Sequence, residues 1–226
     1  MPRHLRNTMF LLHFLIFISG QAAFAQAPSP QFGAVPPPAP GRSAAPAKEW
    51  PGPALLAELK RGGYTLYFRH TSTDFSRDDV KSRGDDDCDN QRPLTEQGRF
   101  EARSIGNDLR QLGIPIGEVL ASPRCRTVEV AQLAFGKFTL APEARGGGFN
   151  QKPVTRYDGL RALFDQGPGA GKNTVIVSHG NPFYATAGAP YLAEGEAAVV
   201  KPLGKDFTVI ARVRWNGWMT LADTAP

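Results

Sequence analysis

The chain has 226 residues, of which 41% are hydrophobic and 21% charged, and its formal net charge is +5. This length and apolar content suit one globular domain with a substantial core. The charge excess is small, and the basic residues are scattered rather than gathered in a stripe with interleaved aromatic side chains. The composition therefore argues against a nucleic-acid partner.

Residues 1–25 have the pattern of a secretory signal peptide. Arg3 and Arg6 supply positive charge, residues 9–18 form an apolar run, and the Ala-Phe-Ala of residues 23–25 is a small-x-small cleavage site. An uncleaved membrane anchor is the alternative, but the apolar run is short for a bilayer. We predict an exported protein, periplasmic or secreted, with no transmembrane segment after removal of the signal peptide.

Two further regions follow this segment. Residues 26–49 are rich in Pro and Ala and have too few large apolar side chains to form a core, so we predict a flexible linker. Residues 50–226 should form the folded domain. His4 and His13 leave with the signal peptide, so the mature chain keeps only His70 and His179.

The domain alternates between helical and strand patterns, and it contains no internal repeat. This predicts an α/β fold with a mostly parallel central sheet and helices on both faces. In chain order we expect a helix over 53–60, a strand over 64–69, a polar loop over 71–92, and a helix from the N-cap Thr95 to Gly113. A strand over 117–121, a helix from 122 to the stop at Gly136, a short strand over 138–140 and a glycine loop or lid hinge at 146–148 should follow. The last elements should be a helix over 157–164, a strand over 174–178, a helix from about 182, and edge strands over 197–200 and 207–215.

Two of these strands each end on a histidine. The first reads Tyr-Thr-Leu-Tyr-Phe-Arg-His up to His70, and the second reads Val-Ile-Val-Ser-His-Gly around His179. In open α/β sheets the carboxyl ends of the strands border the crevice in which ligands bind. We therefore expect both imidazoles at one edge of the sheet, although either histidine alone could be an ordinary hydrogen-bonded side chain.

A third segment, Ser-Pro-Arg-Cys-Arg-Thr at residues 122–127, also lies where a strand turns into a helix. Together the three segments bring two guanidiniums, of Arg69 and Arg126, to the same edge as two imidazoles. Planar guanidiniums can bridge pairs of oxygens on a phosphoryl group, and an imidazole in line with the leaving oxygen can act as nucleophile. This set favours a phosphoryl-transfer site that needs no metal.

Two other site classes fit less well. The surviving histidines and the two cysteines, Cys88 and Cys125, lack the short paired spacings of zinc modules. The aspartates of the loop over 71–92 lack EF-hand spacing and a closing glutamate, so a solvated loop beside the site is favoured over a calcium site.

Four motifs resemble the first branch of the histidine phosphatase superfamily, which has the phosphoglycerate-mutase-like fold: Arg69-His70-Thr71, Leu-Thr-Glu-Gln-Gly-Arg at 94–99, Ser-Pro-Arg-Cys-Arg-Thr at 122–127, and Val-Ser-His-Gly at 177–180. The resemblance implies a three-layer architecture, a phosphohistidine formed on His70 and no cofactor. It implies that Arg69, Arg126 and His179 grip the phosphoryl oxygens. The S-x-x-x-R register, counted from the serine, selects Arg126 over Arg124.

The chain departs from the family in two ways. Thr71 stands where glycine is usual, and its hydroxyl is expected near the phosphate. No motif identifies the acidic proton donor. Asp74, Glu143, Asp158, Glu194 and Glu196 all remain open from sequence, and Glu196 is our choice.

The two cysteines are an even number in a chain bound for an oxidising compartment, so we predict a Cys88–Cys125 disulfide. Two separate buried thiols are the alternative. Within the resemblance, the bridge would tie the loop after His70 to the helix that presents Arg126. Reduction should then weaken phosphate affinity.

The sequence thus predicts an exported, metal-independent phosphomonoester hydrolase, a histidine acid-type phosphatase. A mutase is disfavoured because the resemblance ties that role to a cytosolic pathway. The expected partner is a small phosphorylated substrate, with a sugar phosphate or a phosphate of the lipopolysaccharide core among the options. The alternative is a catalytically inactive protein of the same fold that binds phosphorylated ligands.

Overall fold

The computed structural model describes residue 50, residues 52–145 and residues 156–223. The predicted signal peptide and linker, and the glycine hinge at 146–148, lie outside the described residues. Within the described ranges, no helix combines the length and the apolar character needed to span a bilayer.

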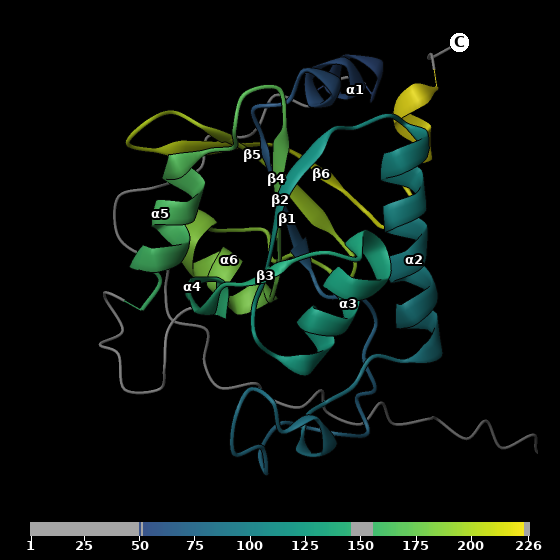
Figure 1. Ribbon diagram of the computed structural model, residues 1–226, viewed down its shortest axis with the longest axis vertical. Coiled ribbons are helices and arrows are strands. Elements are labelled where there is room, and N and C mark those ends of the chain that lie inside the picture. The colour runs from purple at the N-terminus through teal and green to yellow at the C-terminus, as the bar shows by residue number, and fades with distance from the viewer. Residues whose placement is uncertain (1–49, 51, 146–155, 224–226) are drawn as a thin grey trace, which may run out of the picture. The chain divides into compact units, whose positions relative to one another are not determined.

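A six-stranded sheet forms the centre of the domain, with the strand order β3-β2-β4-β1-β5-β6 (Figure 1). The first four strands in this order are parallel, and the last two run antiparallel to their neighbours. The mostly parallel sheet with late strands at one edge is therefore confirmed. The strands are β1 (Thr65–Arg69), β2 (Ile116–Ala121), β3 (Thr139–Leu140), β4 (Asn173–Ser178), β5 (Ala197–Pro202) and β6 (Phe207–Val213).

Helices cover both faces of the sheet, as the sequence predicts (Figure 1). One face carries α1 (Gly52–Arg61), α2 (Glu96–Gln111), α3 (Cys125–Phe135) and the 3₁₀ turn η2 (Met219–Ala222). The other face carries α4 (Pro142–Arg145), α5 (Asp158–Gln166) and α6 (Gly180–Ala187). A further 3₁₀ turn, η1 (Cys88–Asn90), lies in the loop after β1. The sequence reading missed α4 because one helical turn is too short to show a period.

The central strands divide their side chains between two cores. In β1, Leu66 and Phe68 enter the core with α2 and α3, whereas Tyr67 enters the core with α5 and α6. In β4, Val175 enters the core with α2 and α3, and Ile176 enters the core with α5 and α6. Strands buried on both faces have unbroken apolar runs, and this is the pattern that marked them in the sequence.

Helix α2 is capped and packed where the sequence suggests. The Thr95 side chain accepts a hydrogen bond of 3.0 Å from the Gly98 amide. A Cβ on Gly106 would lie 2.0 Å from the carbonyl oxygen of Ala134, so only glycine lets α2 approach α3 this closely. In α3 the buried apolar side chains are Val130, Ala131 and Ala134.

The register places three loop starts at one edge. Arg69 of β1 pairs with Ser178 of β4, and Ala121 of β2 pairs with Val177. The chain then continues from each strand into His70, Ser122 or His179. The backbone amide of His70 donates to Ser178 O at 2.9 Å, and that of Ser122 donates to Val177 O at 2.9 Å.

Candidate active site

His70 and His179 face each other across the ends of β1 and β4. Their ring centroids are 5.6 Å apart, and the ring planes meet at 64°. The structure thus brings together the two histidines that the sequence placed at one edge.

The imidazole of His70 is held in one tautomer. Its Nδ1 lies 3.0 Å from the Thr71 carbonyl oxygen, which can only accept, so Nδ1 carries the proton and Nε2 keeps its lone pair. Only 2% of His70 is exposed. Burial, and then the positive charges of Arg126 and Arg69, hold the pKa of His70 well below its usual value. At neutral pH His70 is therefore an uncharged imidazole with a lone pair on Nε2.

His179 is fixed by Ser122 and by the backbone. Its Nε2 lies 2.9 Å from the Ser122 hydroxyl, and its carbonyl accepts a hydrogen bond of 2.7 Å from the Tyr67 hydroxyl. The Nδ1 atom is buried and has no hydrogen-bond partner among the described residues. Burial, followed by Arg126 and His70, holds the pKa of His179 well below its usual value. In the sequence, Ser122 marked a helix start and the origin of the S-x-x-x-R register, and its contact with His179 was not expected.

Arg69 is held by the segment before β5. Its Nη1 donates to Leu192 O at 2.8 Å, and its Nη2 lies 3.3 Å from a carboxylate oxygen of Glu194. The same carboxylate accepts from the amide and hydroxyl of Thr73 at 3.1 and 2.7 Å. It lies 3.8 Å from Nδ1 of His70, on the side of the ring away from the lone pair.

Arg126 is 7% exposed and forms an ion pair that the sequence did not predict. Asp79, in the polar loop after His70, binds both of its terminal nitrogens at 3.0 Å. The Nε atoms of Arg69 and Arg126 are buried and, within the described ranges, have no hydrogen-bond partner. Thr71, fully buried beside His70, likewise has a hydroxyl oxygen with no partner there.

Arg92 is a further cation near the site that the sequence reading missed. It is 8% exposed, its guanidinium carbon lies 4.6 Å from the centre of the Phe75 ring, and its charge lowers the pKa values of His70 and Arg126. The sequence feature that could have indicated Arg92 is its position at the end of the loop that starts after His70. Arg124, by contrast, reaches into that loop and donates to the Ser82 hydroxyl at 3.0 Å.

The carboxylates near the site occupy distinct places. Glu194 lies on the Nδ1 side of His70, behind the ring, and pairs with Arg69. Glu196, the expected proton donor, accepts from the Ala193 amide at 2.7 Å, and its carbonyl accepts from the Arg69 amide at 3.0 Å. Its role stays a prediction.

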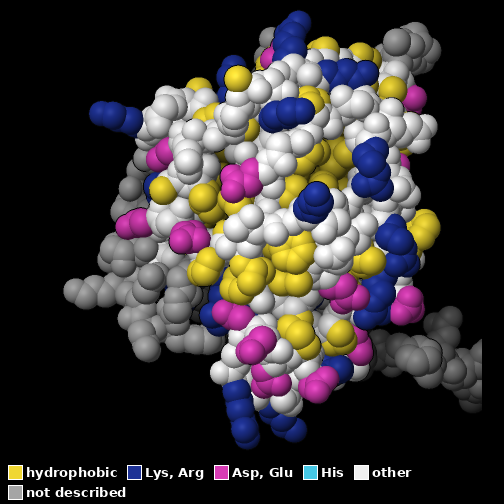
Figure 2. All heavy atoms as spheres, in the orientation of Figure 1, with side chains coloured by type: hydrophobic (Ala, Val, Ile, Leu, Met, Phe, Trp, Pro, Cys, Tyr) yellow, Lys and Arg dark blue, Asp and Glu magenta, His cyan; other side chains and the backbone are white. Residues whose placement is uncertain are grey.

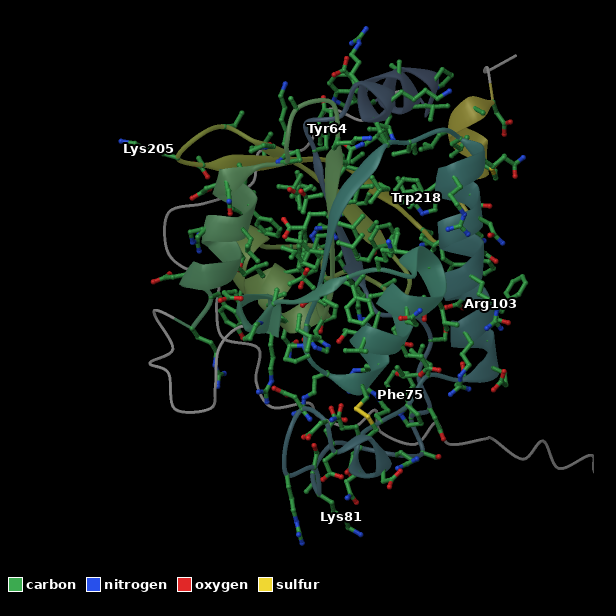
Figure 3. All side chains as sticks on the ribbon, in the orientation of Figure 1. Tyr64, Phe75, Lys81, Arg103, Lys205 and Trp218 are labelled. Atoms are coloured by element: carbon green, nitrogen blue, oxygen red, sulfur yellow. A yellow bond between two sulfur atoms is a disulfide. The ribbon has the colours of Figure 1, made fainter. Side chains whose placement is uncertain are left out.

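The polar loop is fastened to α3 beside the site. The Cys88–Cys125 disulfide is confirmed, with Cα atoms 5.6 Å apart, so these sulfurs are not thiolates for zinc. Asp85 adds ion pairs to Arg124 at 3.6 Å and to Arg145 at 3.1 Å. Figure 3 shows the sulfur bond between the loop and α3, and Figure 2 shows acidic side chains gathered at the loop end of the molecule.

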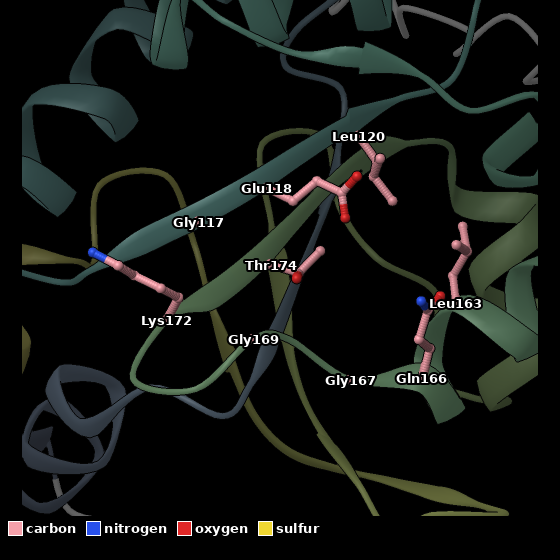
Figure 4. A pocket seen from close by; sticks show the side chains of 9 residues that line it. All are labelled: Gly117, Glu118, Leu120, Leu163, Gln166, Gly167, Gly169, Lys172 and Thr174. Carbon is pink, nitrogen blue, oxygen red and sulfur yellow. The ribbon is translucent and has the colours of Figure 1, made fainter.

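A separate hollow of about 320 Å³ lies at the opposite end of the strands (Figure 4). Its wall includes Glu118, Leu163, Lys172 and Thr174, which lie at or near the start of β2 and β4 or on α5. It shares no residue with the histidine site.

Comparisons with known proteins give structural similarity only. No family model and no curated protein matches the chain. One solved structure that resembles it is the protein histidine phosphatase SixA complexed with tungstate, with 21% identity over 67% of this chain and 97% of that chain and a TM-score of 0.48. YhfR of Bacillus stearothermophilus has 17% identity over 65% of this chain and 94% of that chain, with a TM-score of 0.45. A candidate alpha-ribazole-5′-P phosphatase from Escherichia coli K-12 has 18% identity over 65% of this chain and 94% of that chain, with a TM-score of 0.44. At these identities and TM-scores the similarities do not establish a family.

We expect both histidines to stay neutral under mildly acidic conditions. A chain that begins at Gln26 contains only His70 and His179, so their ring signals can be followed by NMR against pH. Neither should titrate near the ordinary value of 6.5, since burial and Arg126 lower both pKa values. The unfolded chain takes up these protons near pH 6.5 and the folded chain does not. Their contribution to stability should therefore be full above that pH and decline below it. Two midpoints near 6.5 would contradict this.

We expect the disulfide to support both stability and anion binding. Replacing both Cys88 and Cys125 with serine should cost roughly 3–4 kcal/mol of unfolding free energy, from the chain entropy of a loop of this length. It should also weaken the binding of inorganic phosphate, because the loop on Arg126 is released. Denaturation and calorimetric titration measure the two effects. Equal phosphate affinity in a folded variant, or two free thiols in the oxidised protein, would refute the second effect.

Proposed function

We propose that the protein is an exported, metal-independent phosphomonoester hydrolase of the histidine phosphatase superfamily. The observation that carries this proposal is the environment of His70. A buried, neutral imidazole with the lone pair on Nε2 faces a second imidazole across 5.6 Å, and Arg69 and Arg126 border the pair. A nucleophile beside fixed cations is the arrangement that phosphoryl transfer requires.

In the first step, Nε2 of His70 attacks phosphorus and the bond from phosphorus to the ester oxygen breaks. The leaving oxygen takes a proton from an acid, and Glu196 is our proposed donor. In the second step, water attacks phosphorus and gives a proton to the carboxylate left on Glu196, the bond between phosphorus and Nε2 of His70 breaks, and inorganic phosphate leaves. Arg69, Arg126 and His179 bind the phosphoryl oxygens in both steps, and Thr71 adds its hydroxyl.

The proposed substrate is a small phosphate ester. A sugar phosphate or a phosphate of the lipopolysaccharide core would fit an exported enzyme of this chemistry. The arginines recognise the phosphoryl group itself, so they leave the alcohol portion open to other contacts.

A second candidate is a binding protein for phosphorylated ligands. The specific observation in its favour is that the Glu196 carboxylate is engaged by the Ala193 amide. If this contact keeps Glu196 from acting as the acid, the same cations and imidazoles would bind a phosphate ester without turning it over.

Hydrolysis of p-nitrophenyl phosphate in excess EDTA tests the main proposal. We expect activity in the wild type and a loss of at least about 10³-fold in His70→Ala, because the nucleophile is removed. The phosphohistidine should be trapped by rapid quench in the wild type only. An inert wild type that still binds phosphate would support the binding protein, and loss of activity in EDTA would refute metal independence.

Two substrates with different leaving groups test Glu196. Glu196→Gln should lower kcat/KM for an alkyl phosphate by about 10²-fold or more, and lower it far less for p-nitrophenyl phosphate, whose leaving group needs no proton. Glu194→Gln is the comparison, since it disturbs Arg69 and should affect both substrates alike. An equal effect of Glu196→Gln on both substrates would contradict its role as donor.

A further inference from the structure

Asp79 binds the guanidinium of Arg126 end-on. Its Oδ1 lies 3.0 Å from Nη1, and its Oδ2 lies 3.0 Å from Nη2. A guanidinium has five N–H groups in one plane, so an end-on pair leaves its side edge, formed by Nε and one terminal nitrogen, for a second partner. Nε of Arg126 is buried and has no partner among the described residues, so this edge is the part still able to donate.

Arg69 shows the same arrangement from the other side of the site. Its two terminal nitrogens are taken by Leu192 O and Glu194, and its buried Nε has no partner in the described part of the chain. Two arginines from different elements therefore leave the same part of the guanidinium unused. A side edge matches two oxygens of a tetrahedral anion in spacing and direction.

Asp79 is itself held in place. Its Oδ1 accepts a hydrogen bond of 2.8 Å from the Arg92 amide. The Cys88–Cys125 disulfide joins its loop to the residue next to Arg126. Burial alone would raise the pKa of Asp79, but Arg126 and the Arg92 amide outweigh it and keep this pKa below its usual value. Asp79 is thus an anchored carboxylate rather than the tip of a free loop.

We propose that Asp79 is a positioning residue: it fixes Arg126 end-on, so that the Nε edge of the guanidinium receives two oxygens of the phosphoryl group. This inference rests on the proposed function, in which Arg126 binds that group. It assigns a role to the acidic loop after His70, which is to support one cation of the site and, through the disulfide, to keep that support in register.

Two other roles for Asp79 predict different measurements. As an internal competitor it would occupy the phosphate position, and its removal would tighten phosphate binding. As the proton donor it would matter only for substrates with poor leaving groups. If Asp79 is a positioning residue, bound phosphate does not displace it from Arg126. Its removal should then weaken phosphate binding, and substrates with good and poor leaving groups should be affected alike.

The test compares Asp79→Asn with Asp78→Asn in the full chain. Asp78 is the matched control, since it is adjacent and exposed and its carboxylate accepts from the Val80 amide. We expect Asp79→Asn to weaken the binding of inorganic phosphate about 10- to 100-fold, by analogy with the loss seen when a residue that orients a metal ligand is replaced. KM should rise with it for p-nitrophenyl and alkyl phosphates alike, and Asp78→Asn should stay within about twofold of the wild type. In an Arg126→Ala background, Asp79→Asn should add nothing.

Tighter phosphate binding by Asp79→Asn would overturn the proposal in favour of the competitor, and a loss confined to alkyl phosphates would overturn it in favour of the donor. Unchanged phosphate binding would overturn it outright. A wild type that binds phosphate but hydrolyses nothing would refute the hydrolase and leave this test intact, because the probe is inorganic phosphate.

A second measurement does not depend on a folded variant. In the wild type, added inorganic phosphate should shift the Nε–H NMR signals of Arg69 and Arg126. An unshifted Arg126 signal at saturating phosphate would also overturn the proposal.

Discussion

Buried positive charge is the constraint on which the rest of this structure depends. Arg126 and Arg92 are 7% and 8% exposed, and the side chain of Arg69 is 15% exposed. A buried cation is stable only when acceptors or opposite charges replace the water it loses. Asp79, Glu194 and the carbonyl of Leu192 do this here. The acidic loop and the segment before β5 are thus as much a part of the site as the strands.

The same charges set the state of the histidines. An imidazolium would be buried close to several guanidiniums, and both effects favour the neutral ring. A neutral His70 keeps the lone pair on Nε2. The Nε atoms of Arg69 and Arg126 have no hydrogen-bond partner among the described residues, so both guanidiniums can still donate to an anion.

The sheet and the loop stabilise this arrangement in different ways. The strand order sets β1 between β4 and β5, which joins His70 to His179 on one side and to the segment around Glu194 on the other. Close approach at Gly106 lets α2 pack against α3, which carries Arg126. The disulfide then connects the loop that holds Asp79 to the start of the same helix. Each connection joins residues that are far apart in the chain.

Much of the fold followed from local pattern. The two histidine-ended strands, the cap at Thr95, the stop at Gly136 and the edge position of the last strands depend on side-chain period and turn chemistry, which act over a few residues. The pairing of the cysteines followed from their number. The edge shared by Arg69, His70, Arg126 and His179 followed from the rule that parallel strands end together.

The partners of these side chains depended on tertiary structure. Seven aspartates in one polar loop look alike in sequence. Only the folded loop distinguishes Asp79, which pairs with Arg126, from Asp78, which is exposed. Glu194 and Glu196 are two residues apart, yet one lies behind His70 and the other bonds its own loop. Charge and composition select the kinds of residue that form such a site. Which carboxylate meets which guanidinium is decided by contacts across more than forty residues of chain, and no local period encodes those.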